Sequence, residues 1–84
     1  MGKAKQLEKN IKLSEKLAEY IASTPSAVKN IPAGASFVVF SSKDEELNKL
    51  NSKLVVSLKS EGKKVVKATE EKNKKTPWSF SLAI

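Results

Sequence analysis

Apolar residues recur at helical spacing through the first segment of the chain. Between Lys3 and Ser23 the stripe consists of Leu7, Ile11, Ala18 and Ile21, widened by Leu17 and Ala22. This spacing predicts an amphipathic helix that packs through these side chains. The opposite side carries lysines among glutamates, and we expect a solvated face there with i,i+4 ion pairs such as Glu8 with Lys12. The lysines of that face are Lys5, Lys9, Lys12 and Lys16.

Turn residues separate this helix from the first strand. Thr24-Pro25 predicts a short helical turn that Thr24 caps and that continues to Asn30. The run Ile31-Pro32-Ala33-Gly34 ends it, because proline disfavours helix in the residue before it and Gly34 can adopt a positive φ. The β-branched and aromatic run Ser36–Phe40 then predicts a strand covered on both faces.

A second long helix and two more strands follow. Ser42 and Glu45 stand at capping-box spacing, a leucine stripe begins at Leu47, and Gly62 is the expected C-terminal glycine. Val65-Val66 predicts a second strand. The alternation of apolar and small residues from Trp78 to Ile84 predicts a third, half-buried strand after a polar turn.

These elements predict one small α/β domain over residues 1–84, in the order helix, short helix, β, α, β, β. The strand, helix and strand in succession favour a parallel βαβ unit. The C-terminal strand follows a short loop and is therefore expected antiparallel beside the second strand. Three strands with both main helices form a two-layer domain in which one face of the sheet can stay uncovered. The last strand can serve as an edge to which a partner adds.

The composition excludes several classes of enzyme. The 84 residues carry a formal charge of +7, with lysine as the only basic side chain and no histidine or cysteine. Thiolate nucleophiles, histidine-based triads and the usual zinc sites are therefore excluded. The carboxylates have no EF-hand spacing. We expect no catalytic, metal or cofactor site. Short apolar runs and the lack of cysteine favour a cytoplasmic protein that does not span a membrane.

The loop after the first strand is a weak candidate site. In open α/β sheets ligands bind beyond the carboxyl ends of parallel strands, which places Ser42, Asp44 and Glu45 there. A capping box already accounts for the free amides of the helix, so the sequence favours capping over anion binding. Asn48 and Asn51 are expected to hydrogen-bond to backbone or water. Tyr20 and Trp78 fall within apolar patterns and are interpreted as packing side chains.

A lysine cluster around the last two strands is the other weak candidate. It could neutralise phosphates and would then bind nucleic acid without base specificity. The absence of arginine removes the bidentate contacts that read bases, so a solvated surface is the favoured interpretation. The cluster consists of Lys63, Lys64, Lys67, Lys72, Lys74 and Lys75.

Two motifs resemble a family of short bacterial and archaeal proteins known only as a domain of unknown function. They are the Ile-Pro-x-Gly-Ala turn at Ile31–Ala35 and the acidic helix start Asp44-Glu45-Glu46-Leu47. The resemblance covers about Ile11 to Lys67. Members of that family often have a proline where this chain has Glu45. The resemblance implies one small α/β domain of cytosolic prokaryotic type and assigns no site.

The leading hypothesis is a non-enzymatic domain that acts through protein contacts, either as a homodimer or as the small partner of another protein. The alternative is a basic nucleic-acid-binding protein that uses the lysine cluster. A third hypothesis is an enzyme that uses Asp44, Glu45 or Glu70 with Lys43, because carboxylates and lysine act as acids, bases or nucleophiles once their pKa values shift.

Overall fold

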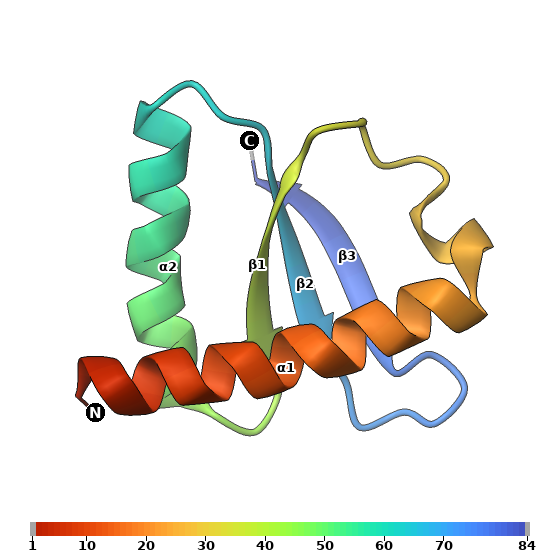
Figure 1. Ribbon diagram of the computed structural model, residues 1–84, viewed down its shortest axis with the longest axis horizontal. Coiled ribbons are helices and arrows are strands. Elements are labelled where there is room, and N and C mark those ends of the chain that lie inside the picture. Colours follow the sequence, from red (N-terminus) through yellow and green to blue (C-terminus); the bar gives the residue numbers. More distant parts are fainter. Residues whose placement is uncertain (1, 84) are drawn as a thin grey trace.

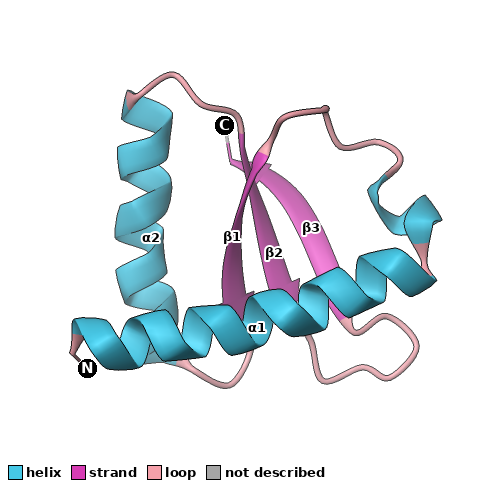
Figure 2. Cartoon of the chain, viewed as in Figure 1, coloured by secondary structure: helices cyan, strands magenta, loops and turns pink. Residues whose placement is uncertain are grey.

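The computed structural model describes residues 2–83, which form two helices, one short 3-10 turn and three strands (Figures 1 and 2). The order of elements is the one expected from the sequence. The elements are α1 (Lys3–Ser23), η1 (Pro25–Val28), β1 (Ser36–Ser41), α2 (Glu45–Ser60), β2 (Val65–Glu70) and β3 (Trp78–Ala83).

The three strands form a mixed sheet in the order β1-β2-β3. β1 and β2 are parallel, from Ser36 opposite Val65 to Ser41 opposite Glu70. β3 returns antiparallel beside β2, with Trp78 opposite Glu70 and Ala83 opposite Val65. The predicted βαβ unit and the antiparallel third strand are both confirmed. Ile84, the last residue of the predicted strand, lies outside the described residues.

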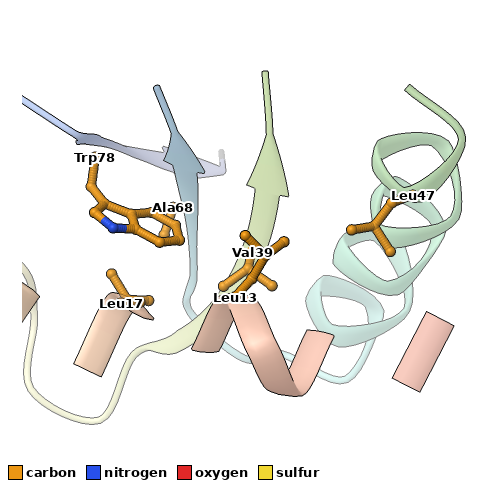
Figure 3. Close-up of a cluster of buried hydrophobic side chains, with 6 residues drawn as sticks. All are labelled: Leu13, Leu17, Val39, Leu47, Ala68 and Trp78. Carbon is orange, nitrogen blue, oxygen red and sulfur yellow. The ribbon is translucent and has the colours of Figure 1, made fainter. Parts of the chain in front are cut away.

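The two main helices pack on the sheet in different ways. α1 lies across the strands, whereas α2 runs alongside β1. The N-terminal part of α1 lies beside the first turns of α2 (Figure 1). Leu13 and Leu17 of α1 pack with Val39, Ala68 and Trp78, which share one face of the sheet because alternate strand residues point the same way (Figure 3).

Side chains of the other sheet face pack against α2. Val38, Phe40 and Val65 form a second cluster with Val55 of α2, so the centre of β1 is covered on both faces, as predicted. Further along β2 and β3 this face carries polar residues: Lys67, Thr69, Ser79 and Ser81. Lys67 lies there with its Nζ 4.9 Å from the centre of the Phe40 ring.

The structure rotates α1 relative to the predicted orientation: Leu17 and Ile21 of the predicted stripe pack in the core, but its first two residues do not. Leu13 and Leu17 are buried at 8% and 5% exposure, whereas Leu7 and Ile11, which the apolar stripe placed in the core, are 62% and 50% exposed. Gln6 and Asn10 of the inward side bond to Asn51 of α2. Two stripes of helical period run along α1, and the sheet contacts the one that contains these amides.

Two glycines enable the chain reversals that the sequence predicted. Gly62 has φ +79° after the end of α2. Its amide donates to the Lys59 carbonyl at 2.9 Å, and the Lys63 amide donates to the Leu58 carbonyl at 3.1 Å, which is the Schellman arrangement. Gly34 has φ +78° in the turn before β1.

The predicted cap at Thr24 is wrong. Its side chain makes no capping hydrogen bond to η1, and its backbone carbonyl accepts from the Ala27 amide instead.

No helix within residues 2–83 has the length and apolar character needed to cross a lipid bilayer.

Candidate functional site

The carboxyl ends of β1 and β2 meet the side of α1 that carries lysines. Lys9 Nζ lies 2.6 Å from Asp44 Oδ2 in the β1–α2 loop, and Lys16 Nζ lies 3.4 Å from Glu70 Oε2 at the end of β2. Between α1 and this loop is a cavity of about 190 Å³, which we call the strand-end hollow. It is lined by Lys9, Lys12, Leu13, Lys16, Ser41, Asp44 and Leu47.

Asp44, and not Ser42, caps α2. The Asp44 carboxylate accepts from the Leu47 amide at 3.0 Å, and the helix begins at Glu45. The predicted Ser42–Glu45 capping box is therefore wrong. The reason is the parallel pairing of β1 and β2: it continues past Ser41, where the Ser42 amide donates to the Glu70 carbonyl at 3.0 Å. The hydrogen bonding between the strands thus continues one residue past the end of β1, and Ser42 starts no helix.

The electrostatics of the hollow do not favour acid–base chemistry. The hydrogen bond from Lys9, together with the one from the Leu47 amide, lowers the pKa of Asp44 below its usual value of 3.8. A general acid or base at neutral pH needs a carboxyl pKa raised toward 7, so Asp44 is shifted in the wrong direction. Glu45 is exposed, and Glu70 is paired with Lys16.

The hollow is also poorly suited to bind a free anion or a metal ion. Each of its three lysines has a carboxylate partner, because Lys12 lies 3.3 Å from Glu8. An entering anion would have to compete with these carboxylates. Among residues 2–83 no three acidic side chains stand close enough together to hold a metal ion.

The two asparagines of α2 bond to the backbone of β1, as the sequence analysis expected. Asn48 Nδ2 donates to the Ser41 carbonyl at 2.6 Å, and Asn48 Oδ1 accepts from the Ser41 amide at 2.9 Å. Asn51 has 0% exposure and donates to the Val39 carbonyl at 2.8 Å. It also exchanges hydrogen bonds with Asn10. These side chains join both helices to the edge of β1, so their role is structural.

The structure divides the predicted lysine cluster between two ends of the sheet. Lys63 and Lys64 precede β2, whereas Lys72, Lys74 and Lys75 follow it in the β2–β3 loop. A strand of six residues separates the two groups by roughly 20 Å, at about 3.3 Å per residue.

Lys67 belongs to neither end of the sheet, because it lies within β2 over the Phe40 ring. The β2–β3 loop starts at the carboxyl end of β2, where Glu70 contacts Lys16 of α1. The same end carries Lys43, next to the Asp44 partner of Lys9. We call these lysines of the carboxyl end the basic edge: Lys9, Lys16, Lys43, Lys72, Lys74 and Lys75.

The aromatic side chains pack within the fold, as predicted for Tyr20 and Trp78. Trp78 is buried in the cluster beneath α1 (Figure 3). The rings of Tyr20 and Phe80 are stacked with their centroids 6.5 Å apart. Both predicted stacking candidates therefore take part in packing within the fold.

Large apolar side chains are exposed where α1, α2 and the start of β1 meet. Phe37 and Leu54 line a cavity of about 140 Å³ together with Asn10 and Ser14 of α1. Leu7 and Ile11 lie three residues before Asn10 and Ser14, respectively, so they continue this surface along the helix. We call it the helix corner: Leu7, Ile11, Phe37 and Leu54, all exposed.

The apolar pattern of α1 predicted Leu7 and Ile11 in the core, so the helix corner was not predicted as an exposed surface. The available signal was a second apolar stripe on α1, formed by Leu13 and Tyr20 together with Leu17, which also borders the first stripe. Both stripes cannot face the sheet, so one of them had to be exposed.

Comparison with known proteins assigns the chain to a family. The model of a family of unknown function, DUF5647, matches residues 5–77. The chain belongs to this family. The match includes the β2–β3 loop, which the resemblance seen in the sequence left out, and ends directly before Trp78. No curated protein and no solved structure matches the chain. Membership in DUF5647 therefore supports a domain of unknown function and assigns no site residue.

Proposed function

We propose that this DUF5647 protein is a non-enzymatic module that acts by binding another protein chain through the helix corner. The observation that carries the proposal is the exposure of two adjoining pairs of large apolar side chains. Phe37 and Leu54 line one cavity with Asn10 and Ser14 of α1. Leu7 and Ile11 line another cavity on α1, about one helical turn before those two residues. Contiguous exposed apolar surface on a small domain marks an interaction site. Scattered single residues would need no such explanation.

The charged features of the molecule support the same proposal by contrast. The lysines of the strand-end hollow are paired, and the pKa of Asp44 is lowered and not raised. The polar side chains that converge from both helices, above all Asn51, are engaged with each other and with the backbone. An apolar surface is what remains for a partner. The cytoplasm stays the proposed compartment, on the ground that the chain has no cysteine.

The test is recovery of partners by the tagged full-length chain in its own host, after nuclease treatment. Three proteins are compared: wild type, the corner variant Leu7→Gln with Leu54→Gln, and the control Val56→Gln. Val56 is another exposed apolar residue of α2, 68% exposed, and does not belong to the helix corner. We expect wild type and the control to retain one stoichiometric protein, either a second copy or another chain, that the corner variant loses. Equal recovery by all three proteins would refute the proposal.

A second candidate function is binding of nucleic acid at the basic edge. The observation that favours it is the position of Lys43 and of the three lysines of the β2–β3 loop at one end of the sheet, where Lys9 and Lys16 are already paired with carboxylates. Lysine contacts to phosphate give salt-dependent binding without base specificity.

Fluorescence anisotropy with a labelled oligonucleotide over a series of salt concentrations tests this candidate. In the variant Lys72→Gln, Lys74→Gln, Lys75→Gln the slope of log affinity against log salt concentration should become less steep by roughly 2–3. Each lysine that neutralises a phosphate contributes about 0.9 to the steepness of that slope. The variant Lys63→Gln, Lys64→Gln at the other end of the sheet is the matched control. Absence of binding at low salt, or an equal effect of both variants, would exclude the basic edge.

A further inference from the structure

α1 carries an exposed seam with the spacing of a two-stranded coiled coil. Small and apolar residues follow one another at intervals of three, four, three and four positions, which is the a and d pattern of a heptad repeat. All of them are exposed, whereas Leu13 and Leu17 on another side of the helix are buried. We call this set the outer seam: Ala4, Leu7, Ile11, Ser14 and Ala18.

The seam has the chemistry of a contact between helices. Leu7 and Ile11 supply the apolar side chains, while Ala4, Ser14 and Ala18 are small enough to let a second helix approach closely. Ile11 occupies an a position and Leu7 a d position, the combination that favours two parallel strands. The 21 residues of α1 span about 31 Å at 1.5 Å per residue, nearly the whole 33 Å length of the molecule.

The charges beside the seam fit a second copy of this chain. In this register Lys3 takes a g position and Glu8 the e position of the next heptad. Parallel coiled coils place each g residue opposite the next e residue of the partner helix. Lys3 of each copy would therefore face Glu8 of the other, and the symmetry makes this pair twice. In an antiparallel pair e residues face e residues, which would bring Glu8 and Glu15 of the two copies together.

We propose that the partner at the helix corner is a second copy of this chain, with the two α1 helices parallel and packed through the outer seam. This inference rests on the proposed function and names its partner. Only two large apolar residues of each copy lie in the seam. The dimer is therefore small and polar at its rim, the kind of interface that associates in the micromolar range.

The first experiment measures mass against concentration by sedimentation velocity, from about 1 µM to about 500 µM, a range that brackets micromolar affinity. Wild type should shift from 9.2 kDa toward twice that mass. Leu7→Gln with Ile11→Gln should raise the dissociation constant at least tenfold, because both residues lie at the centre of the contact. Val56→Gln, an exposed helical residue outside the seam, should change it less than twofold.

A second experiment tests the orientation, which the absence of native cysteine makes simple. Ala4→Cys and Ala18→Cys should each form a disulfide-linked dimer with itself, since parallel helices bring equal positions together. An antiparallel pair would link neither variant to itself, because each of these positions would then lie near the opposite end of the partner helix. Ser81→Cys on the edge strand β3 is the control and should stay unlinked.

The outcomes separate this inference from the proposed function. A chain that stays at 9.2 kDa at every concentration overturns the second copy. If the corner variant still loses a different host protein in that case, the proposed function stands. Linkage through Ser81→Cys, or only between unlike α1 positions, also overturns the inference. If wild type is a monomer at every concentration and the corner variant recovers the same host partners as wild type, both proposals are refuted.

Discussion

Replacing Asn51 by alanine tests whether the amide network joins the two helices to the sheet. Asn51 is fully buried, donates to the Val39 carbonyl at 2.8 Å and to Asn10 Oδ1 at 2.8 Å, and accepts from Gln6 at 3.1 Å. Asn10 also donates to it, at 3.3 Å. Alanine removes all four hydrogen bonds at once.

The expected loss follows from what happens to each partner. Gln6 and Asn10 are half-buried and can turn toward water, so each of their bonds contributes only about 0.5–1.5 kcal/mol to stability. The Val39 carbonyl belongs to a buried residue and cannot be hydrated, which costs about 1–3 kcal/mol. We expect the free energy of unfolding to fall by about 3 kcal/mol. That is a large share of the roughly 4–13 kcal/mol available to a chain of this length.

Urea unfolding followed by tryptophan fluorescence measures this loss. Trp78 is the single tryptophan and is buried, so its emission reports the folded core. The matched control is Ser52→Ala, one residue further along α2. Its exposed hydroxyl bonds only to the Asn48 carbonyl, and we expect a change of less than about 0.5 kcal/mol. A loss below about 1 kcal/mol in Asn51→Ala would refute the structural role given to the network.

Three further predictions concern the same fold. Leu13→Ala should cost about 2–4 kcal/mol and Leu7→Ala less than about 0.5 kcal/mol by urea unfolding, and a larger loss in Leu7→Ala than in Leu13→Ala would show that α1 packs through the other stripe. Asp44→Asn keeps a capping side chain but removes the charge that Lys9 contacts. Because the folded pKa of Asp44 is lowered, its contribution to stability is present above the unfolded pKa of about 3.9 and is lost as pH falls through the folded pKa. Thermal melts of wild type and Asp44→Asn should therefore differ at pH 7 and converge below about pH 4, and a constant difference would contradict the assignment. Gly62→Ala should lower the free energy of unfolding by about 1 kcal/mol through its φ of +79° alone, since no atom crowds the site, and an unchanged urea midpoint would argue against that φ.

The order and pairing of the strands could be predicted from the sequence because local signals and long-range pairing agreed there. The run Ser36–Phe40 and the alternation after Trp78 have strand periodicities, and Gly62 marks the end of the helix between strands. A strand, a helix and a strand in succession then favour the parallel arrangement that the structure has. No alternative assignment fits these segments equally well.

The orientation of α1 could not be predicted, because polarity alone misidentifies its inner side. Gln6 and Asn10 look solvent-facing in sequence, and Leu7 and Ile11 look buried. The amides face inward because Asn51 offers them hydrogen bonds from another helix, a contact between residues more than 40 positions apart. The cap of α2 was misplaced for a related reason: only the pairing of Ser42 with Glu70 shows that the strand continues.

The exchange of amides for aliphatic side chains on α1 has a functional implication. A chain of 84 residues has little apolar surface to bury, so exposing Leu7 and Ile11 forgoes stability that the core would otherwise gain. The Asn51 network makes that arrangement possible, because it holds the N-terminal half of α1 in place with hydrogen bonds instead of apolar contacts. The side of the helix turned away from the network is then free to contact another chain. Stability of the fold and availability of the outer seam therefore depend on the same polar cluster, and Asn51→Ala should weaken both.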